Sequence, residues 1–73
     1  MVKVKAKDLQ QGDAIRVDHW SNLWKRVAPT TATVLAVSEF GSNRSILAKV
    51  RDGLNEFVSD IFADAEEEYE KIA

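Results

Sequence analysis

The stretch DLQQGDAIRV, residues 8–17, decides the fold class because it joins a turn to an alternating strand. Gly12 and Asp13 are typical turn residues, and after them Ile15 and Val17 alternate with polar side chains. Alternation with a period of two places the apolar side chains on one face of a strand. A Gly-Asp turn that leads into such a strand is typical of the start of a small β-barrel.

The segments that follow predict a meander of antiparallel strands. Residues 33–37 and 45–51 are rich in Val, Ile, Leu and Ala, and the turn residues 41–43 between them predict a hairpin. Asp52-Gly53 predicts a second tight turn, after which residues 56–59 return antiparallel.

Two segments flank or interrupt this meander. Residues 1–5 alternate Val with Lys and predict a short edge strand, where lysines discourage unwanted pairing. Residues 19–23 predict a loop, and a second strand is expected to begin at residue 24. Pro29 lacks a backbone donor, so residues 28–32 predict a bulge or a flexible loop within that strand.

The C-terminal segment has a helical spacing of apolar residues. Phe62, Ala65, Tyr69 and Ile72 lie three, four and three residues apart, and the Ala, Glu and Lys around them favour helix. We therefore expect a mainly β protein in which residues 1–59 form the barrel. Residues 60–73 are expected to form an acidic short helix, with a strand as the alternative, packed on the same single domain.

Composition sets limits on the kind of protein. The chain has 73 residues and no cysteine, so one small core without disulfides is expected. Hydrophobic residues make up 45% and charged residues 30%, as in an ordinary globular domain. No run approaches the roughly 18 apolar residues of a membrane span, and the first residues do not resemble a signal peptide. We expect a cytoplasmic protein with no membrane contact.

The net charge of -2 is unevenly distributed. Residues 1–58 contain nine Lys and Arg against six Asp and Glu, whereas residues 59–73 contain six acidic residues and one Lys. Two interpretations stay open: a solvated acidic face, or a body that faces nucleic acid and carries an acidic end.

The motif formed by Asp8-Leu9, Gly12-Asp13 and Ile15, followed by Trp24-x-x-Val27, a Val-rich strand and Asp52-Gly53, resembles the SH3-like barrels of translation and transcription proteins. The resemblance covers about residues 5–59. Similar short chains occur among proteins of actinobacteria and actinophages. The resemblance implies a five-stranded, strongly bent barrel whose loops bind nucleic acid, the ribosome or polymerase, or a peptide.

The residues do not form a pattern typical of catalysis. The single histidine, His19, lies beside Asp18, but neighbours along a strand point in different directions and cannot be assumed to form a triad. The acidic residues after residue 59 lack the spacing of a calcium loop, and the three glycines do not form a phosphate-binding loop. We therefore expect no enzyme activity, metal, cofactor or small-molecule substrate.

One cluster combines aromatic and cationic side chains in the way that suits a ligand. The candidate ligand-binding residues are Arg16, His19, Trp20, Lys25 and Arg26. Aromatic faces stack on bases or pack against peptides, while cations contact phosphates. Trp24, in contrast, is expected to fill the core.

Two functions of different class follow. In the favoured one, Phe62, Tyr69 and Ile72 form an apolar stripe that docks on a partner protein or a second copy, and the chain is a protein-interaction or assembly module, such as one encoded by a phage. In the alternative, Trp20 stacks on a nucleic acid whose phosphates contact basic residues: Lys25, Arg26, Arg44, Lys49 and Arg51. The acidic sequence pI of about 5.3 favours the first, because nucleic-acid-binding domains are usually basic.

Overall fold

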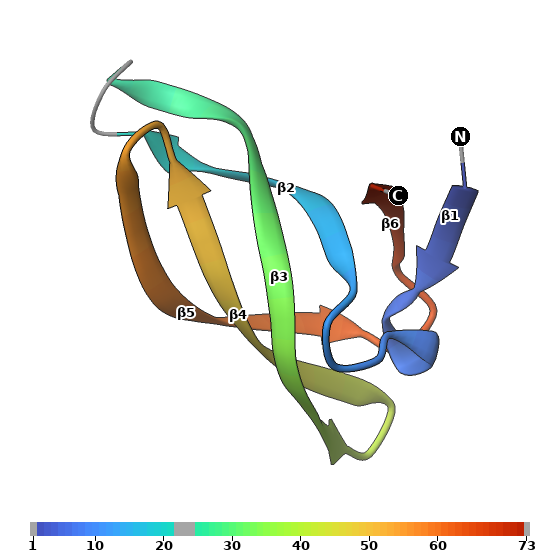
Figure 1. The fold of residues 1–73 in the computed structure, drawn as a ribbon. Coiled ribbons are helices and arrows are strands. Elements are labelled where there is room, and N and C mark those ends of the chain that lie inside the picture. Colours follow the sequence, from blue (N-terminus) through green and yellow to red (C-terminus); the bar gives the residue numbers. More distant parts are fainter. Residues whose placement is uncertain (1, 22–24, 73) are drawn as a thin grey trace.

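A computed structural model describes residues 2–21 and 25–72 of the chain, and the side chains of residues 2–18 and 25–72. Its elements in chain order are β1 (Val2–Lys5), η1 (Ala6–Asp8), β2 (Ala14–Ser21), β3 (Arg26–Phe40), β4 (Asn43–Asp52), β5 (Asn55–Asp64) and β6 (Glu68–Ile72). The strands form one antiparallel sheet in the order β1-β6-β2-β3-β4-β5. The sheet twists and curls strongly (Figure 1), yet over the described ranges it does not close into a barrel, and β1 and β5 are its edges.

The predicted meander is confirmed from β2 to β5, and two tight turns fix its register. Phe40 pairs with Asn43, and Asp52 pairs with Asn55, so each turn has two residues between paired strands. Gly41 and Gly53 occupy the first of these two positions with φ angles of 59° and 62°. Only glycine adopts such angles at no steric cost, and its place at this position is typical of type II′ hairpins.

The prediction of a C-terminal helix is wrong, and so is the prediction of five strands. Residues 60–64 continue β5, and residues 68–72 form β6 between β1 and β2. The backbone of β6 forms hydrogen bonds with a strand on each side, and a helix at this place would lose these bonds. Tertiary pairing therefore overrides the helical propensity of the Ala and Glu residues. Within the described ranges the single helical element is η1, and it is not long or apolar enough to cross a membrane.

The interruption expected at residues 28–32 is also wrong, because β3 runs through them. Pro29 pairs with Asp18 of β2, whereas the pairing of β3 with β4 begins only at Thr31. Pro29 therefore lies where β3 has one strand neighbour, and its missing N–H disrupts no second ladder. The irregularity in β3 lies instead between Val34 and Ala36, where its register with β4 shifts. The loop expected over residues 19–23 is wrong for residues 19–21, because β2 extends to Ser21, and the rest of it lies outside the described residues.

The core lies inside the curl of the sheet. Its largest fully buried side chains are Ile15 of β2, Val34 of β3, and Ile46 and Val50 of β4. Ala6 and Leu9, in and after η1, belong to the same cluster. The predicted alternation of β2 is confirmed, since Ile15 and Val17 are buried while Arg16 and Asp18 are exposed.

Removal of two methyl groups from the core should destabilise this small domain strongly. Val34 is 0% exposed, so Val34→Ala should lower the free energy of unfolding by about 2 kcal/mol through lost burial and a cavity. Val27 lies on the same strand but is 63% exposed, and Val27→Ala should change that free energy by less than about 0.5 kcal/mol. Urea denaturation of both variants measures the difference, and equal losses would contradict this placement of the core.

Candidate functional site

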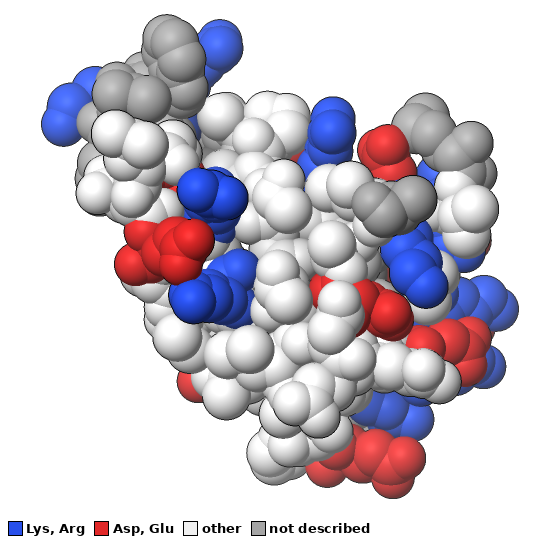
Figure 2. Space-filling model, viewed as in Figure 1, with Lys and Arg blue, Asp and Glu red and all other residues white. Residues whose placement is uncertain are grey.

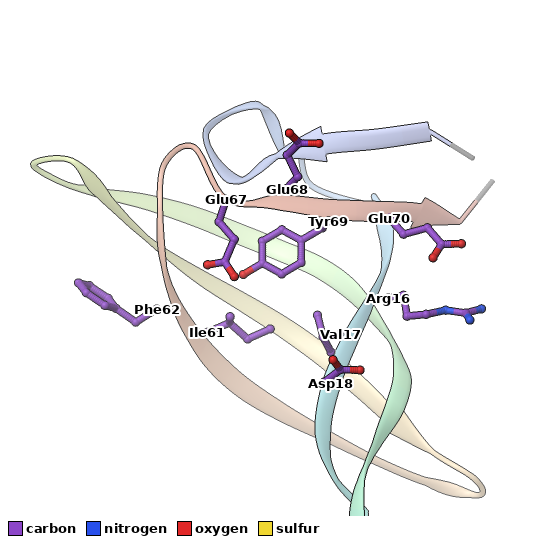
Figure 3. Close-up of a pocket in the computed structure, with 9 residues that line it drawn as sticks. All are labelled: Arg16, Val17, Asp18, Ile61, Phe62, Glu67, Glu68, Tyr69 and Glu70. Carbon is purple, nitrogen blue, oxygen red and sulfur yellow. The ribbon is translucent and has the colours of Figure 1, made fainter.

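A groove opens where β6 leaves β2. The two strands pair only over three positions, from Ala14 with Ile72 to Arg16 with Glu70. Beyond Arg16, β2 has no strand partner on this side within the described residues. The space between β2, β5 and β6 is a groove of about 500 Å³ (Figure 3). It is lined by Arg16, Val17, Asp18, Ile61, Phe62, Glu67, Glu68, Tyr69 and Glu70.

Apolar side chains from three strands meet in this groove. Figure 3 shows the ring of Tyr69 extending from β6 toward Ile61 of β5 and Val17 of β2. Val17 is buried, and Ile61 and Tyr69 are half-buried. Burial, and to a smaller extent the negative charge of Glu67, raises the pKa of the Tyr69 hydroxyl above its usual value. Tyr69 therefore presents a neutral phenol and an aromatic ring to whatever enters the groove.

The charge around this apolar floor is mainly negative. Asp18 and three glutamates on or next to β6 stand against one cation, Arg16, which lies opposite Glu70 in the strand register. In Figure 3 the carboxylate of Glu67 lies beside the Tyr69 ring, Asp18 lies next to Val17, and Glu68 points away toward β1. Across the described part of the chain, no ion pair involves the four carboxylates of Asp18, Glu67, Glu68 and Glu70.

A tight turn between β5 and β6 places Tyr69 in the groove. The Asp64 side chain accepts a hydrogen bond of 2.9 Å from the Glu66 N–H, and the backbone carbonyl of Asp64 accepts one of 3.0 Å from the Glu67 N–H. An Asp side chain bonded to the backbone two residues later is typical of turns and competes with helix formation. The Ala65 N–H also donates to the Ser42 carbonyl at 2.9 Å, which attaches this turn to the β3–β4 turn.

Two lysines hold the same turn from the N-terminal side. Lys5 Nζ lies 2.7 Å from one carboxylate oxygen of Glu66, and Lys7 Nζ lies 2.8 Å from the other. The hydrogen bonds and charges of Lys5 and Lys7 lower the pKa of Glu66 to about 2. In return, Glu66 raises the pKa of Lys5. Backbone hydrogen bonds of 2.7 Å from Ala6 to Glu67 and 3.1 Å from Lys7 to Ala65 run alongside these ion pairs.

The structure brings together residues from both candidate sets predicted from the sequence. Arg16 lines the groove together with Phe62 and Tyr69. Ile72 lines a second hollow of about 560 Å³, at the C-terminal end of β6, with Val2 and Gly12 among its walls.

The other predicted ligand-binding residues lie elsewhere. Lys25 and Arg26 are exposed at the far end of the β2–β3 hairpin and do not line the groove. The backbones of His19 and Trp20 belong to β2, but their side chains lie outside the described residues, as does Trp24.

Sequence reasoning missed the groove residues Val17, Asp18, Ile61 and Glu67 as site residues. The helical interpretation of residues 60–73 hid Ile61 and Glu67, because it separated Ile61 from the strand that carries it. Val17 and Asp18 were assigned to a strand, but the sequence did not indicate which elements lie beside it in space. One signal was present: Phe57, Ile61 and Ala63 all fall on one face of an extended strand that continues past residue 59, with Ser59 as the one polar residue among them.

Comparisons of the chain with protein-family models, with curated protein sequences and with solved structures found no match. The described side chains, those of residues 2–18 and 25–72, include no group of three or more acidic side chains arranged to hold a metal ion. Functional evidence for this chain therefore comes from the geometry and charge of its surface.

Several basic side chains of the sheet are already engaged. Lys49 Nζ and Arg51 Nε lie 3.1 and 3.8 Å from the carboxylate of Glu56. Arg44 donates hydrogen bonds to the carbonyls of Gly41 and Asn43, at 3.1 and 2.8 Å. Figure 2 shows basic and acidic side chains interspersed on the face in view, not a continuous basic surface.

The lysine pair on Glu66 should make stability depend on pH in acid. Because the pKa of Glu66 falls from 4.5 to about 2 on folding, its contribution is complete above 4.5 and is lost as the pH falls toward 2. Glu66→Gln should therefore be less stable than the native chain at neutral pH and equally stable near pH 2. Urea midpoints across this range test the expectation, and a difference that stays constant would contradict it.

Proposed function

We propose that this chain is a protein-interaction module that binds an extended segment of a partner protein as an added strand between β2 and β5. The observation that carries the proposal is the groove itself, which is bordered by two strand edges. β5 ends the sheet, and β2 has no partner beyond Arg16 on this side within the described residues. In an antiparallel sheet, alternate residues of an edge strand direct their N–H and C=O groups outward, ready to pair with another chain.

Strand addition of this kind is a common way to bind a peptide. The main-chain hydrogen bonds supply affinity, and pockets for alternate side chains supply specificity. Here the pocket is formed by Val17, Ile61 and Tyr69. The sheet of the chain alone is open, but an added strand between β2 and β5 would join its two curled sides. The proposal therefore retains an SH3-like barrel as the fold that the chain forms together with the bound segment. It assigns the chain no reaction.

Nucleic acid is the competing ligand, and the charge of the described surface favours protein. The groove has four carboxylates and one guanidinium, and phosphates would be repelled from it. Arg44, Lys49 and Arg51, which the nucleic-acid hypothesis assigned to phosphates, already lie against carbonyls or Glu56.

The test begins with selection from a displayed library of random peptides of about ten residues, the length of β5. The selected peptide is then added to the labelled protein, and amide hydrogen exchange is followed by NMR. Alternate amides of β5, together with amides of β2 after Arg16, should become protected on binding. Peptides that protect other amides, a failure to select any peptide, or protection of the same amides by a single-stranded oligonucleotide would overturn the proposal.

Two exposed phenylalanines provide a matched pair of variants. Phe62 is 66% exposed and lines the groove, whereas Phe40 is 58% exposed and does not line it. Their rings contact each other with centroids 6.2 Å apart, so either substitution removes the same ring contact. Phe62→Ala should weaken binding of the selected peptide by about five- to thirtyfold, as for an aromatic interface residue, and Phe40→Ala should leave it nearly unchanged. Fluorescence anisotropy measures both, and equal effects would place the peptide outside the groove.

A further inference from the structure

The chemistry of the groove also specifies which segments it selects, and this inference rests on the proposed function. We infer that the bound segment alternates apolar residues with Lys or Arg. An extended strand presents every second side chain to the same face, so a segment lying between β2 and β5 presents one set of side chains to the apolar floor. That floor consists of Val17, Ile61 and Tyr69, which favours apolar side chains in this set.

The carboxylates around the floor favour cations in the other set. Glu67 and Asp18 lie on different walls of the groove, on the β5–β6 turn and on β2, with Tyr69 and Val17 between them in Figure 3. Neither carboxylate belongs to an ion pair within the described part of the chain. Lys and Arg side chains that leave the strand at alternate positions are long enough to reach such groups, and an acidic segment would be repelled.

The chain already contains one strand that alternates apolar residues with Lys. It pairs with the edge of β6 that faces away from β2. β1 has the sequence Val-Lys-Val-Lys, and it pairs with β6 so that Lys3 lies opposite Glu70 and Lys5 opposite Glu68. Val4 lies opposite Tyr69 and packs against the core. Opposite charges placed directly across a strand pair are stabilising. The glutamates and the tyrosine of β6 that line the groove therefore already pair with a strand that alternates Val and Lys.

The decisive comparison uses two labelled peptides, one that alternates Val with Lys and one that alternates Val with Glu. Each is about ten residues long, which is the length of β5. Anisotropy titrations with the full chain at about 50 mM salt should show at least about tenfold tighter binding of the Val-Lys peptide, because the Asp18 and Glu67 carboxylates attract Lys and repel Glu. That preference should decrease as salt rises and shortens the screening length.

Single carboxylates can then be neutralised without change of size. Glu67→Gln and Asp18→Asn should each weaken binding of the Val-Lys peptide by about two- to fivefold, as for partly exposed ion pairs. Glu39→Gln is the matched control, since it removes the same charge from the β3–β4 hairpin, outside the groove. Equal weakening by Glu39→Gln would show that only the net charge matters, and it would overturn the inference.

This inference and the proposed function can fail separately. If library peptides protect β5 and β2 amides but the Val-Lys and Val-Glu peptides bind equally, the charge selectivity is refuted and the strand addition stands. If no peptide protects those amides, both are refuted. Binding of the Val-Lys peptide with protection of amides outside β2 and β5 would likewise refute both.

Discussion

The pairing of β6 on both of its edges is the constraint on which the rest of the structure depends. One edge joins β1 and the other joins the start of β2, so this short strand connects the N-terminal segment to the meander. β6 reaches that position because Asp64 terminates β5 in a turn and because Lys5 and Lys7 hold Glu66. Without that turn the acidic end of the chain would have no backbone partners, and β1 would have no place in the sheet.

The same strand creates the groove, because it departs from β2 after three paired positions. A longer β6 that followed β2 further would fill the space that Tyr69 now lines. The geometry therefore leaves two backbone edges open around an apolar floor. Carboxylates accumulate there because the acidic end of the chain supplies one side of the groove. Shape and charge at this place thus have a common origin in the path of residues 64–70.

The elements that the sequence predicted correctly are those governed by local signals. Gly41 and Gly53 specify tight turns, and the alternation of Ile15 and Val17 specifies which face of β2 is buried. The C-terminal segment was mispredicted because its Ala and Glu residues favour helix locally, while its strand depends on partners more than fifty residues away, such as Val4 opposite Tyr69. The groove could not be predicted for a similar reason: Asp18 lies more than forty residues before Ile61 and Glu67 in the sequence, and only the curl of the sheet brings β2 and β5 to the same groove.

The open edge of β5 has a consequence for the protein in concentrated solution. An exposed strand edge is a template for pairing with other copies of the same chain. Here such pairing would bring Asp60 and Asp64 of one copy, with the groove carboxylates nearby, against the identical charges of the next. Like charges therefore oppose self-association at this edge, and this protection weakens as salt screens it. The acidic residues near the C-terminal end of the chain thus also bear on its colloidal stability.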